Sequence, residues 1–308
     1  MSHGTFENEA QPPMAEDIAE INRFHFNKIA SSYITKPWQR ELIQQLTTFV
    51  LSNLSWIGVD FISPSSEFEA LESLRTSSIK PVRFLDYACG PGTLTAIFLP
   101  YITEAVGIDI SENMVSMYNT RFAEDSEAPT PNLAKLQPRA VVGNFCYPDT
   151  ETSPSAYLTD PVYHNFDFAA VGFGCHHFDN LPLCTSRLVS RLNPDGGVFM
   201  IADFFDKRSL SSSSPPKHQT ADGHHTHDTS HQAPSPPETD HRSSMYGMTH
   251  PHGFTKEYVE KLLTDAGLTE IKIKPFDDAF KVEWENKAGE VKVEEMIGFL
   301  AVGTRRKV

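Results

Sequence analysis

The sequence predicts an α/β fold with a doubly wound, seven-stranded and mostly parallel sheet. Two observations lead to this prediction. From residue 82 onward, apolar strand patterns alternate with helix patterns, which is typical of parallel strands joined by helices. The first strand pattern also runs directly into a loop rich in small residues, ACGPGTLT, before a helix begins. The chain of 308 residues is long enough to bury the core of such a sheet.

Seven segments have the pattern of a strand. Residues 166–174 (FDFAAVGFG) are apolar throughout, as in a strand that is covered on both faces. The last two segments, 269–276 and 295–306, follow each other across a charged stretch without a helix between them, which predicts antiparallel pairing at the end of the sheet. The other predicted strands span residues 82–87, 105–110, 140–145 and 197–205.

Helices are predicted between the strands, and two of them carry clear end signals. Ser111 can cap a helix over residues 111–122. Thr255 can cap a second helix, which Gly267 ends. The remaining predicted helices of this part span residues 93–100 and 181–192.

The chain before the first strand predicts a helical cap. Thr35 can cap a helix there, and Pro37 suits its first turn because the missing N–H has no partner at that position. The apolar face of this helix contains Leu42, Leu46, Phe49 and Val50.

Two polar segments divide the chain. Residues 1–14 and 206–249 are poor in aliphatic side chains and cannot bury enough surface to offset the entropy of ordering, so we expect both to be disordered. The second is rich in Ser, Pro and His, and we expect a solvated linker there because a flexible tract has no preformed ligand geometry. The predicted organisation is a disordered N-terminus, a helical cap and connection over 15–80, and a sheet domain over 81–308 that carries the insertion.

Charge and composition disfavour several classes of partner. The formal net charge of −14 repels phosphate, so neither a nucleic acid nor an anionic membrane is expected. No apolar run has the length of a membrane span, and the N-terminus lacks the pattern of a signal peptide. The four cysteines form no CxxC pair, which favours a reducing compartment. We expect a cytoplasmic protein, with the nucleus as an alternative, that acts on a small molecule.

The loop after the first strand predicts a ligand site. Asp86, Ala88, Gly90 and Gly92 give the pattern acidic-x-small-x-Gly-x-Gly at the carboxyl end of a strand, where open parallel sheets bind ligands. Small residues let the backbone approach a ligand with its N–H groups pointing outward. A dinucleotide site would need a third glycine where this chain has Thr95.

Several further motifs, in order, make the chain similar to a known family. They are VGIDISENMV, GNF, FDFAAVGFGCHHFDN and LVSRLNPDGGVFMIADFF, together with the N-terminal segment FHFNKIASSYITKPWQ. With these motifs the chain resembles the class I S-adenosylmethionine-dependent methyltransferases of the small-molecule type, from about residue 22 to 304 apart from the insertion. The resemblance implies a Rossmann-like fold, S-adenosylmethionine as cofactor and S-adenosylhomocysteine as product.

The resemblance also implies which residues bind the cofactor. Asp109, 17 residues after Gly92, would accept hydrogen bonds from both ribose hydroxyls. Ile110 and Met114 would cover the adenine, and the amide oxygen of Asn144, which stands where the family more often has aspartate, would accept from the adenine amino group. The other implied contacts are Tyr33, Asp86, Ala88, Gly90, Gly92, Phe145, Gly172 and His177.

The implied reaction is an in-line displacement in which an O, N, S or C nucleophile of a small molecule attacks the sulfonium methyl. A site that excludes water and aligns the reactants favours it. A hydroxyl or thiol would also need a base, for which we prefer His250 or His252, just before a Gly-Phe pair on a loop that can face the site. His176 and His177 are the other candidates and are expected to act as wall contacts. No metal ion is expected.

Other functions are compatible with parts of the sequence. A protein methyltransferase would share the cofactor site, and a non-catalytic regulatory protein would bind the cofactor and act through partners. A nicotinamide-dependent oxidoreductase would use the loop for a dinucleotide, against which the missing third glycine counts. Methylation of nucleic acid bases is disfavoured because GFGC stands where an Asn/Asp-Pro-Pro-aromatic tetrad would be. The sequence does not identify the acceptor or the oligomeric state.

Overall fold

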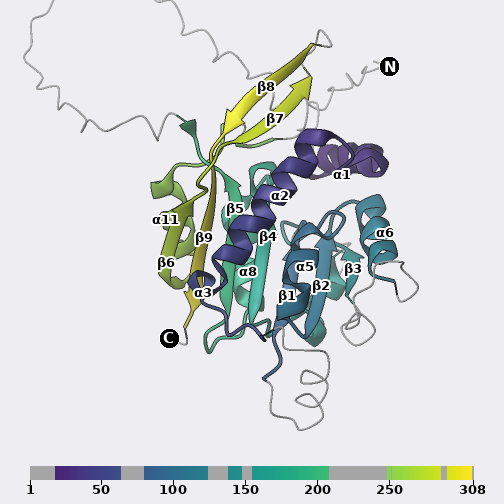
Figure 1. Ribbon diagram of the computed structural model, residues 1–308. Helices are drawn as coiled ribbons and strands as arrows, with labels where there is room; N and C mark the ends of the chain where they lie inside the picture. The colour runs from purple at the N-terminus through teal and green to yellow at the C-terminus, as the bar shows by residue number, and fades with distance from the viewer. Residues whose placement is uncertain are drawn as a thin grey trace, which may run out of the picture.

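A seven-stranded sheet in the order β3-β2-β1-β4-β5-β9-β6 forms the centre of the molecule (Figure 1). This computed structural model describes residues 18–63, 80–123, 138–147, 155–207, 248–250, 252–285 and 290–306. The first five strands are parallel, and β9 runs antiparallel between β5 and β6. The strands are β1 (Arg83–Tyr87), β2 (Glu104–Asp109), β3 (Arg139–Val142), β4 (Phe168–Gly172), β5 (Val198–Phe204), β6 (Leu268–Pro275) and β9 (Gly298–Arg305). The predicted seven-stranded, mostly parallel sheet is confirmed.

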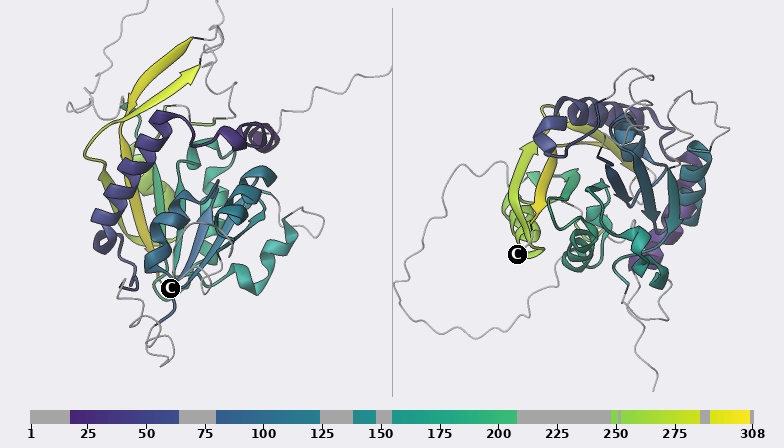
Figure 2. Two further views of the ribbon diagram at one scale, coloured as in Figure 1. Left: turned by 45° about the vertical axis from the view of Figure 1, so that its right-hand side comes forward. Right: turned by 90° about the horizontal axis from the view of Figure 1, so that it is seen from below.

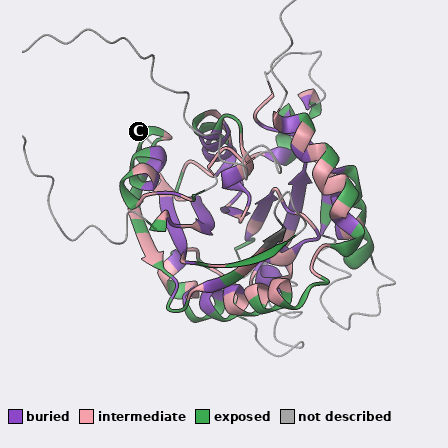
Figure 3. Ribbon diagram, turned by 90° about the horizontal axis from the view of Figure 1, so that it is seen from above, coloured by how far each residue is buried: buried purple, intermediate pink, exposed green. Residues whose placement is uncertain are grey.

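Helices cover both faces of this sheet, because its strands bury side chains to either side. Leu85 and Val171 join one core with α8 and α11, whereas Phe84 and Phe168 join the opposite core with α2 and α5. Figure 2 shows helices on either side of the strands, and Figure 3 shows buried central strands with exposed outer helix surfaces. The helices are α1 (Ile18–Ile29), α2 (Pro37–Ser52), α3 (Leu54–Ile57), α5 (Thr93–Phe98), α6 (Glu112–Arg121), α8 (Leu181–Arg191) and α11 (Lys256–Asp265). The predicted doubly wound arrangement is confirmed.

Three predicted helix ends are found in the structure. The Oγ of Ser111 accepts a hydrogen bond from the backbone N–H of Met114 at 3.2 Å, so Ser111 caps α6. The Oγ1 of Thr255 accepts from the N–H of Tyr258 at 3.1 Å and caps α11 in the same way. Gly267, with φ of +87°, follows the last residues of α11 in the left-handed conformation that ends a helix.

The start of α2 differs from the prediction. Pro37 is its first residue, as expected, but the N-cap is Lys36 and not Thr35. The Oγ1 of Thr35 instead donates to the carbonyl of Ser32 at 2.6 Å, because a short 3-10 turn (Ala30–Ser32) precedes the helix. The side chain of Gln39 accepts from the Lys36 N–H at 3.1 Å.

The charged stretch between β6 and β9 forms a hairpin that the sequence analysis did not predict. Its strands, β7 (Phe280–Glu285) and β8 (Val291–Met296), pair antiparallel in a separate two-stranded sheet that extends away from the main sheet (Figure 1). Phe280 anchors its base: the ring is fully buried and lies 4.8 Å from that of Phe276. Val291 and Val293 are exposed farther along.

The predicted disordered segments fall mostly on residues that the structure does not describe. Residues 1–14 lie wholly outside the described ranges, and of the predicted insertion over 206–249 only residues 206, 207, 248 and 249 lie inside them. Within the described ranges, every helix is too short or too polar to cross a membrane.

Candidate active site

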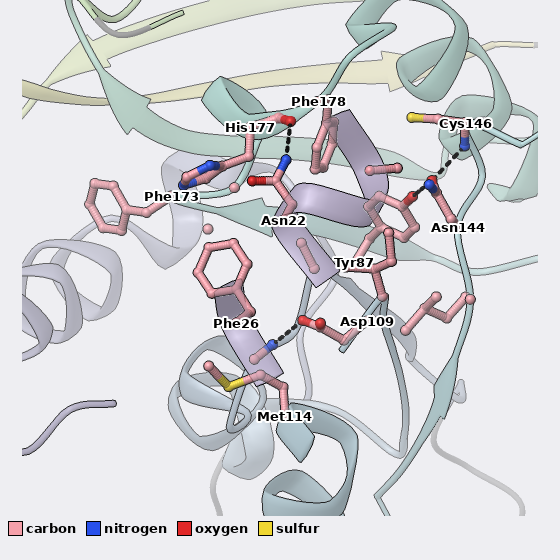
Figure 4. Close-up of a pocket in the computed structure, with 18 of the residues that line it drawn as sticks. Asn22, Phe26, Tyr87, Asp109, Met114, Asn144, Cys146, Phe173, His177 and Phe178 are labelled. Atoms are coloured by element: carbon pink, nitrogen blue, oxygen red, sulfur yellow. Dashed lines mark hydrogen bonds between the residues drawn. The ribbon is translucent and has the colours of Figure 1, made fainter. Parts of the chain in front are cut away.

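A cleft of about 730 Å³, partly open to solvent, lies at the carboxyl ends of β1, β2 and β4. β1 has β2 on one side and β4 on the other, so the strand order reverses at this point. Ligands of open α/β sheets bind at such a switch point. The α1 helix and the loops after these strands supply the walls (Figure 4).

Asp109, the last residue of β2, is a buried carboxylate that lines the cleft. Its Oδ2 accepts from the backbone N–H of Gly90 at 2.8 Å, and its Oδ1 accepts from the N–H of Ser111 at 2.8 Å. Burial raises the pKa of Asp109 to about 6, and the backbone N–H groups act in the opposite direction. The chain thus fixes this carboxylate where the loops after β1 and β2 meet.

The glycine loop follows β1 with three residues in left-handed conformation: Ala88 (φ +54°), Gly90 (φ +50°) and Gly92 (φ +80°). A Cβ built on Gly90 meets nothing within 4 Å, and Gly90 lines the cleft, so the bare backbone faces open space there. A Cβ on Gly92 would lie 2.4 Å from the ring of Phe122. The second glycine is therefore required by helix packing behind the cleft.

Asp86 is buried in β1 and does not line the cleft. Its Oδ2 accepts from both the N–H and the Oγ1 of Thr95, at 3.0 and 2.7 Å, so the carboxylate satisfies the start of α5. Burial raises the pKa of Asp86 to about 7, although the bonds from Thr95 lower it. In this structure Asp86 holds the glycine loop to its helix.

The loop after β3 brings Asn144 to the cleft and turns Phe145 away from it. The Asn144 Oδ1 accepts from the hydroxyl of Tyr87 at 3.1 Å and from the N–H of Cys146 at 2.8 Å. Both lone pairs are thereby occupied, so Asn144 would offer a ligand its Nδ2 group and not the predicted oxygen. The buried Phe145 ring stacks on Tyr87 at 5.1 Å. Tyr87, which the sequence analysis missed, lines the cleft.

Helix α1 forms one wall of the cleft. The Asn22 Nδ2 donates to the carbonyl of His177 at 2.9 Å across 155 residues of chain (Figure 4). The ring of Phe26 stands edge-on to that of His177, with centroids 5.1 Å apart, and edge-on to that of Tyr33 at 6.4 Å. Burial, with a smaller contribution from Asp109, raises the pKa of Tyr33 to about 12.

The turn after β4 forms the opposite wall. Phe173, Gly174 and Phe178 line the cleft there together with the predicted residues Gly172 and His177. A Cβ on Gly174 would lie 3.0 Å from the Cβ of Ala88, so the loops after β1 and β4 are in close contact.

The predicted bases His250 and His252 do not line the cleft. The ring of His250 packs against Phe254 and Tyr258 at centroid distances of 4.8 and 5.6 Å, and its Nδ1 lies 3.0 Å from the Oγ1 of Thr249. Burial lowers the pKa of His250. His252 is exposed. A catalytic role for either residue stays a prediction.

The predicted site residues fall into three groups: residues behind the cleft, the two predicted bases, and residues that line the cleft. Asp86, Gly92 and Phe145 support the cleft from behind, and the two predicted bases lie away from its lining. On the side of β1 to β3, the predicted residues that line the cleft are Ala88, Gly90, Asp109, Ile110, Met114 and Asn144. On the side of α1 and β4 they are Tyr33, Gly172 and His177. Within the described ranges, no group of three or more His, Cys, Asp or Glu side chains is placed to hold a metal ion.

The cleft and sheet order agree with the comparison to a family of known proteins. The sequence model of a methyltransferase domain family matches residues 62–273, which is more than half of the chain. The protein belongs to this methyltransferase family. The prediction of a class I S-adenosylmethionine-dependent methyltransferase is confirmed.

Individual relatives of this methyltransferase are distant. An uncharacterized methyltransferase of Schizosaccharomyces pombe is 24% identical over 268 residues, 83% of this chain and 82% of that protein. The magnesium protoporphyrin IX methyltransferase from Synechocystis PCC 6803, solved with bound S-adenosylmethionine, is 14% identical with a TM-score of 0.48, covering 96% of this chain and all of that one. The YcgJ protein from Bacillus subtilis is 12% identical with a TM-score of 0.45, covering 79% of this chain and all of that one.

Proposed function

We propose that this methyltransferase transfers the methyl group of S-adenosylmethionine to a small-molecule acceptor bound in the cleft. The position of Asp109 carries the proposal. It is a buried carboxylate at the end of β2, oriented by two backbone N–H groups beside a glycine loop. An acidic side chain at this point of a doubly wound sheet suits a ribose with two free hydroxyls.

The residues of the cleft fit this cofactor. The carboxylate of Asp109 accepts from the N–H groups of Gly90 and Ser111 and has further lone pairs that can accept from a hydroxyl. Gly90 presents backbone without a side chain, and Ile110 and Met114 would cover the adenine. When bound, the cofactor supplies an electrophilic methyl group on a positively charged sulfur.

The other half of the cleft suits the acceptor. The rings of Phe26, Phe173 and Phe178 line it, and they would hold an acceptor in place and exclude water. Exclusion of water favours a displacement in which charge is lost, and alignment of the two reactants lowers its entropic barrier.

A small acceptor is favoured over a polypeptide by helix α1, which lines the cleft. Helix α1 crosses it and is tethered on both sides, by Asn22 to the carbonyl of His177 and by Asn27, whose Oδ1 accepts from the Oγ of Ser111 at 2.7 Å. A polypeptide segment would have to displace this helix.

We also infer that the protein works in a reducing compartment such as the cytoplasm. All four cysteines are free thiols, and Cys89, Cys175 and Cys184 are buried. Burial raises the pKa of each of these three thiols, which keeps them in the protonated, unreactive form.

Calorimetric titration with S-adenosylhomocysteine tests the proposed function, with NADH as the control ligand. We expect micromolar binding of the first and none of the second. Binding of NADH alone would support the oxidoreductase alternative. Binding of S-adenosylhomocysteine without methylation of any acceptor would favour the non-catalytic alternative.

A further inference from the structure

We propose that His177 accepts the proton of a neutral aromatic hydroxyl acceptor, and that the buried pair Asp203–His176 positions His177 for this role. The proposal rests on the proposed function, since it names the acceptor class and the base of the same cleft. It replaces the bases that the sequence favoured with a residue that lines the cleft.

The charges of the cleft favour a neutral acceptor over one that carries a carboxylate or phosphate group. Asp109 and Asp179 line it, whereas no lysine or arginine among the described residues does so. A carboxylate or phosphate group would enter without a lysine or arginine partner and beside two carboxylates, which is costly in a partly buried site. The aromatic rings of Phe26, Phe173 and Phe178 favour a planar, apolar body that stacks or packs edge-on.

The other titratable side chains of the cleft are poor bases for this reaction. Burial raises the pKa of Tyr33 and of Tyr87, so both hydroxyls keep their protons at neutral pH. Asp109 is bonded to two backbone N–H groups and is assigned to the ribose. Asp179 is exposed, so an acceptor proton transferred to it would not be shielded from solvent.

Cys146 is a poor candidate for a different reason. Its Sγ lies 3.9 Å from the carbonyl of Asn180, and its N–H is bonded to Asn144 on the β3 side of the cleft. His177, in contrast, stands on the β4 turn beside Phe26 and Phe173. Imidazole changes its charge near neutral pH, which suits a general base.

The backbone and ring of His177 are held from several directions. Its carbonyl accepts from Asn22, and its N–H donates to the carbonyl of Gly174 at 3.1 Å. Its ring lies edge-on to that of Phe26 and tilted against that of His176, with centroids 4.3 Å apart in the second pair and an interplanar angle of 41°. The orientation of His177 therefore depends on the ring of His176.

His176 is in turn fixed by Asp203 of β5. The Nδ1 of His176 lies 2.8 Å from the Oδ1 of Asp203, which also accepts from the N–H of Phe204 at 2.8 Å. The Asp203 side chain is fully buried, and its Oδ2 has no partner among the described residues. A buried carboxylate with an unpaired oxygen is costly to a fold, and such groups gather at functional sites.

The chain around the end of the predicted insertion, at residues 249 and 250, contacts the same turn. The carbonyl of His176 accepts from the N–H groups of Thr249 and His250 at 2.9 and 3.2 Å, and the Oγ1 of Thr249 donates to the carbonyl of Phe178 at 2.7 Å. The turn that carries His177 is thus attached to β5, α1 and residues 249–250 at once.

In the proposed step, two bonds form and two bonds break. The acceptor oxygen forms a bond to the methyl carbon while its O–H bond breaks and the proton passes to a ring nitrogen of His177. The electron pair of the methyl–sulfur bond remains on sulfur, which becomes a neutral thioether. The proton on His177 is released to solvent after the products leave.

Two acceptors of different acidity test the role of His177. Phenol must lose its proton during the reaction, whereas 4-nitrophenol is already ionised at a slightly alkaline pH. We expect His177→Gln to lower kcat/KM for phenol by about 100-fold or more and to leave kcat/KM for 4-nitrophenol within about threefold. An equal loss with both acceptors would show that His177 binds or shapes the site, and would overturn its role as a base.

Three further variants serve as references. His164→Gln changes a histidine that precedes β4, at the end opposite the cleft, and is expected to keep wild-type rates. His250→Gln and His252→Gln test the bases that the sequence favoured. If either of these two loses the phenol reaction selectively while His177→Gln does not, the proposal is wrong.

A double variant tests the positioning pair. The amide of Asp203→Asn accepts a weaker hydrogen bond from the imidazole than the carboxylate does, so the rings of His176 and His177 are held less firmly. We expect about a tenfold loss of kcat with phenol, little change with 4-nitrophenol, and no further loss when Asp203→Asn is added to His177→Gln. Additive losses in the double variant would mean that Asp203 acts independently of His177.

Titration with S-adenosylhomocysteine separates failure of this proposal from failure of the proposed function. If the wild-type protein does not bind S-adenosylhomocysteine, the methyl-transfer proposal itself is wrong. Normal binding together with methylation of amines or carboxylates, but of neither phenol, would remove only the acceptor class and the role of His177.

Discussion

The two sides of the cleft are built in different ways. The side at the ends of β1 and β2 consists of segments that are nearly continuous in sequence: the glycine loop, and Asp109 with the start of α6. The side at the end of β4 depends on contacts over long distances along the chain, such as Asn22 with His177 and Thr249 with His176. This difference teaches that one side of a cleft, when made of local backbone geometry, can be recognised in a sequence, whereas a side assembled from distant segments cannot.

A pair of glycine substitutions gives the largest expected effect and tests the first side by itself. Gly92→Ala places a Cβ 2.4 Å from Phe122 in a left-handed conformation, and we expect a loss of about 2–5 kcal/mol in the free energy of unfolding. Gly90→Ala has the strained conformation but no neighbour within 4 Å, and should cost about 1 kcal/mol while weakening cofactor binding. Urea denaturation measures both, and equal losses would refute the division into a packing glycine and a ligand-facing glycine.

Removing one carboxylate from each side of the cleft tests whether the cofactor binds to one side only. Asp109→Ala should reduce the affinity for S-adenosylhomocysteine by about 1.5–3 kcal/mol, because the ribose hydroxyls lose a charged acceptor. Asp179→Ala, on the β4 side, is the matched control and should leave that affinity unchanged. Calorimetry measures the affinity of both variants for S-adenosylhomocysteine. A loss of affinity in both would mean that the cofactor contacts both sides of the cleft.

The pH dependence of stability tests the role of Asp86, which lies behind the side of the cleft at the ends of β1 and β2. Burial raises the pKa of Asp86 from its ordinary value of 3.8 to about 7, so the folded state binds a proton that the unfolded state has released between these values. Stability should therefore fall as the pH rises from about 4 to about 7, by on the order of 1–3 kcal/mol.

Asp86→Asn should remove much of this dependence, since the amide oxygen can still accept from Thr95 and carries no charge. Denaturation at several pH values measures the effect, with Asp60→Asn, at an exposed position, as the control. An unchanged slope in Asp86→Asn would assign the pH dependence to other groups.

The smallest expected effect concerns the tether between α1 and the β4 side. Asn22→Ala removes the hydrogen bond to the carbonyl of His177, which is worth about 1 kcal/mol. We expect KM for the acceptor to rise several-fold while the affinity for S-adenosylhomocysteine changes little. If the two affinities fall together, α1 is a lid on the whole cleft and the two sides are not independent.

The sequence analysis missed one element whose signal was present. The stretches FKVEWE and VKVEE alternate apolar and charged residues, which is the period of a strand with one covered face. Because the stretch is highly charged, no strand was predicted there. The two strands pair as a hairpin, and the fully buried Phe280 anchors it to the main fold. The cap of α2 was misplaced because Thr35 bonds to a 3-10 turn that the sequence analysis did not predict.

The sequence by itself determined the number and the mostly parallel arrangement of the strands, the helix ends at Ser111 and Gly267, and the positions of the glycine loop and of Asp109 at the ends of two strands. These features follow from local rules, namely hydrophobic period, capping and the backbone freedom of glycine, which act over a few residues. Only the tertiary structure decided three contacts. Asp86 accepts from Thr95 at the start of α5, the Asn144 amide oxygen accepts from the Tyr87 hydroxyl, and Asp203 lies within hydrogen-bonding distance of His176, beside His177. Such contacts join separate strands, and their geometry is set by how the strands and helices pack, which no local pattern encodes.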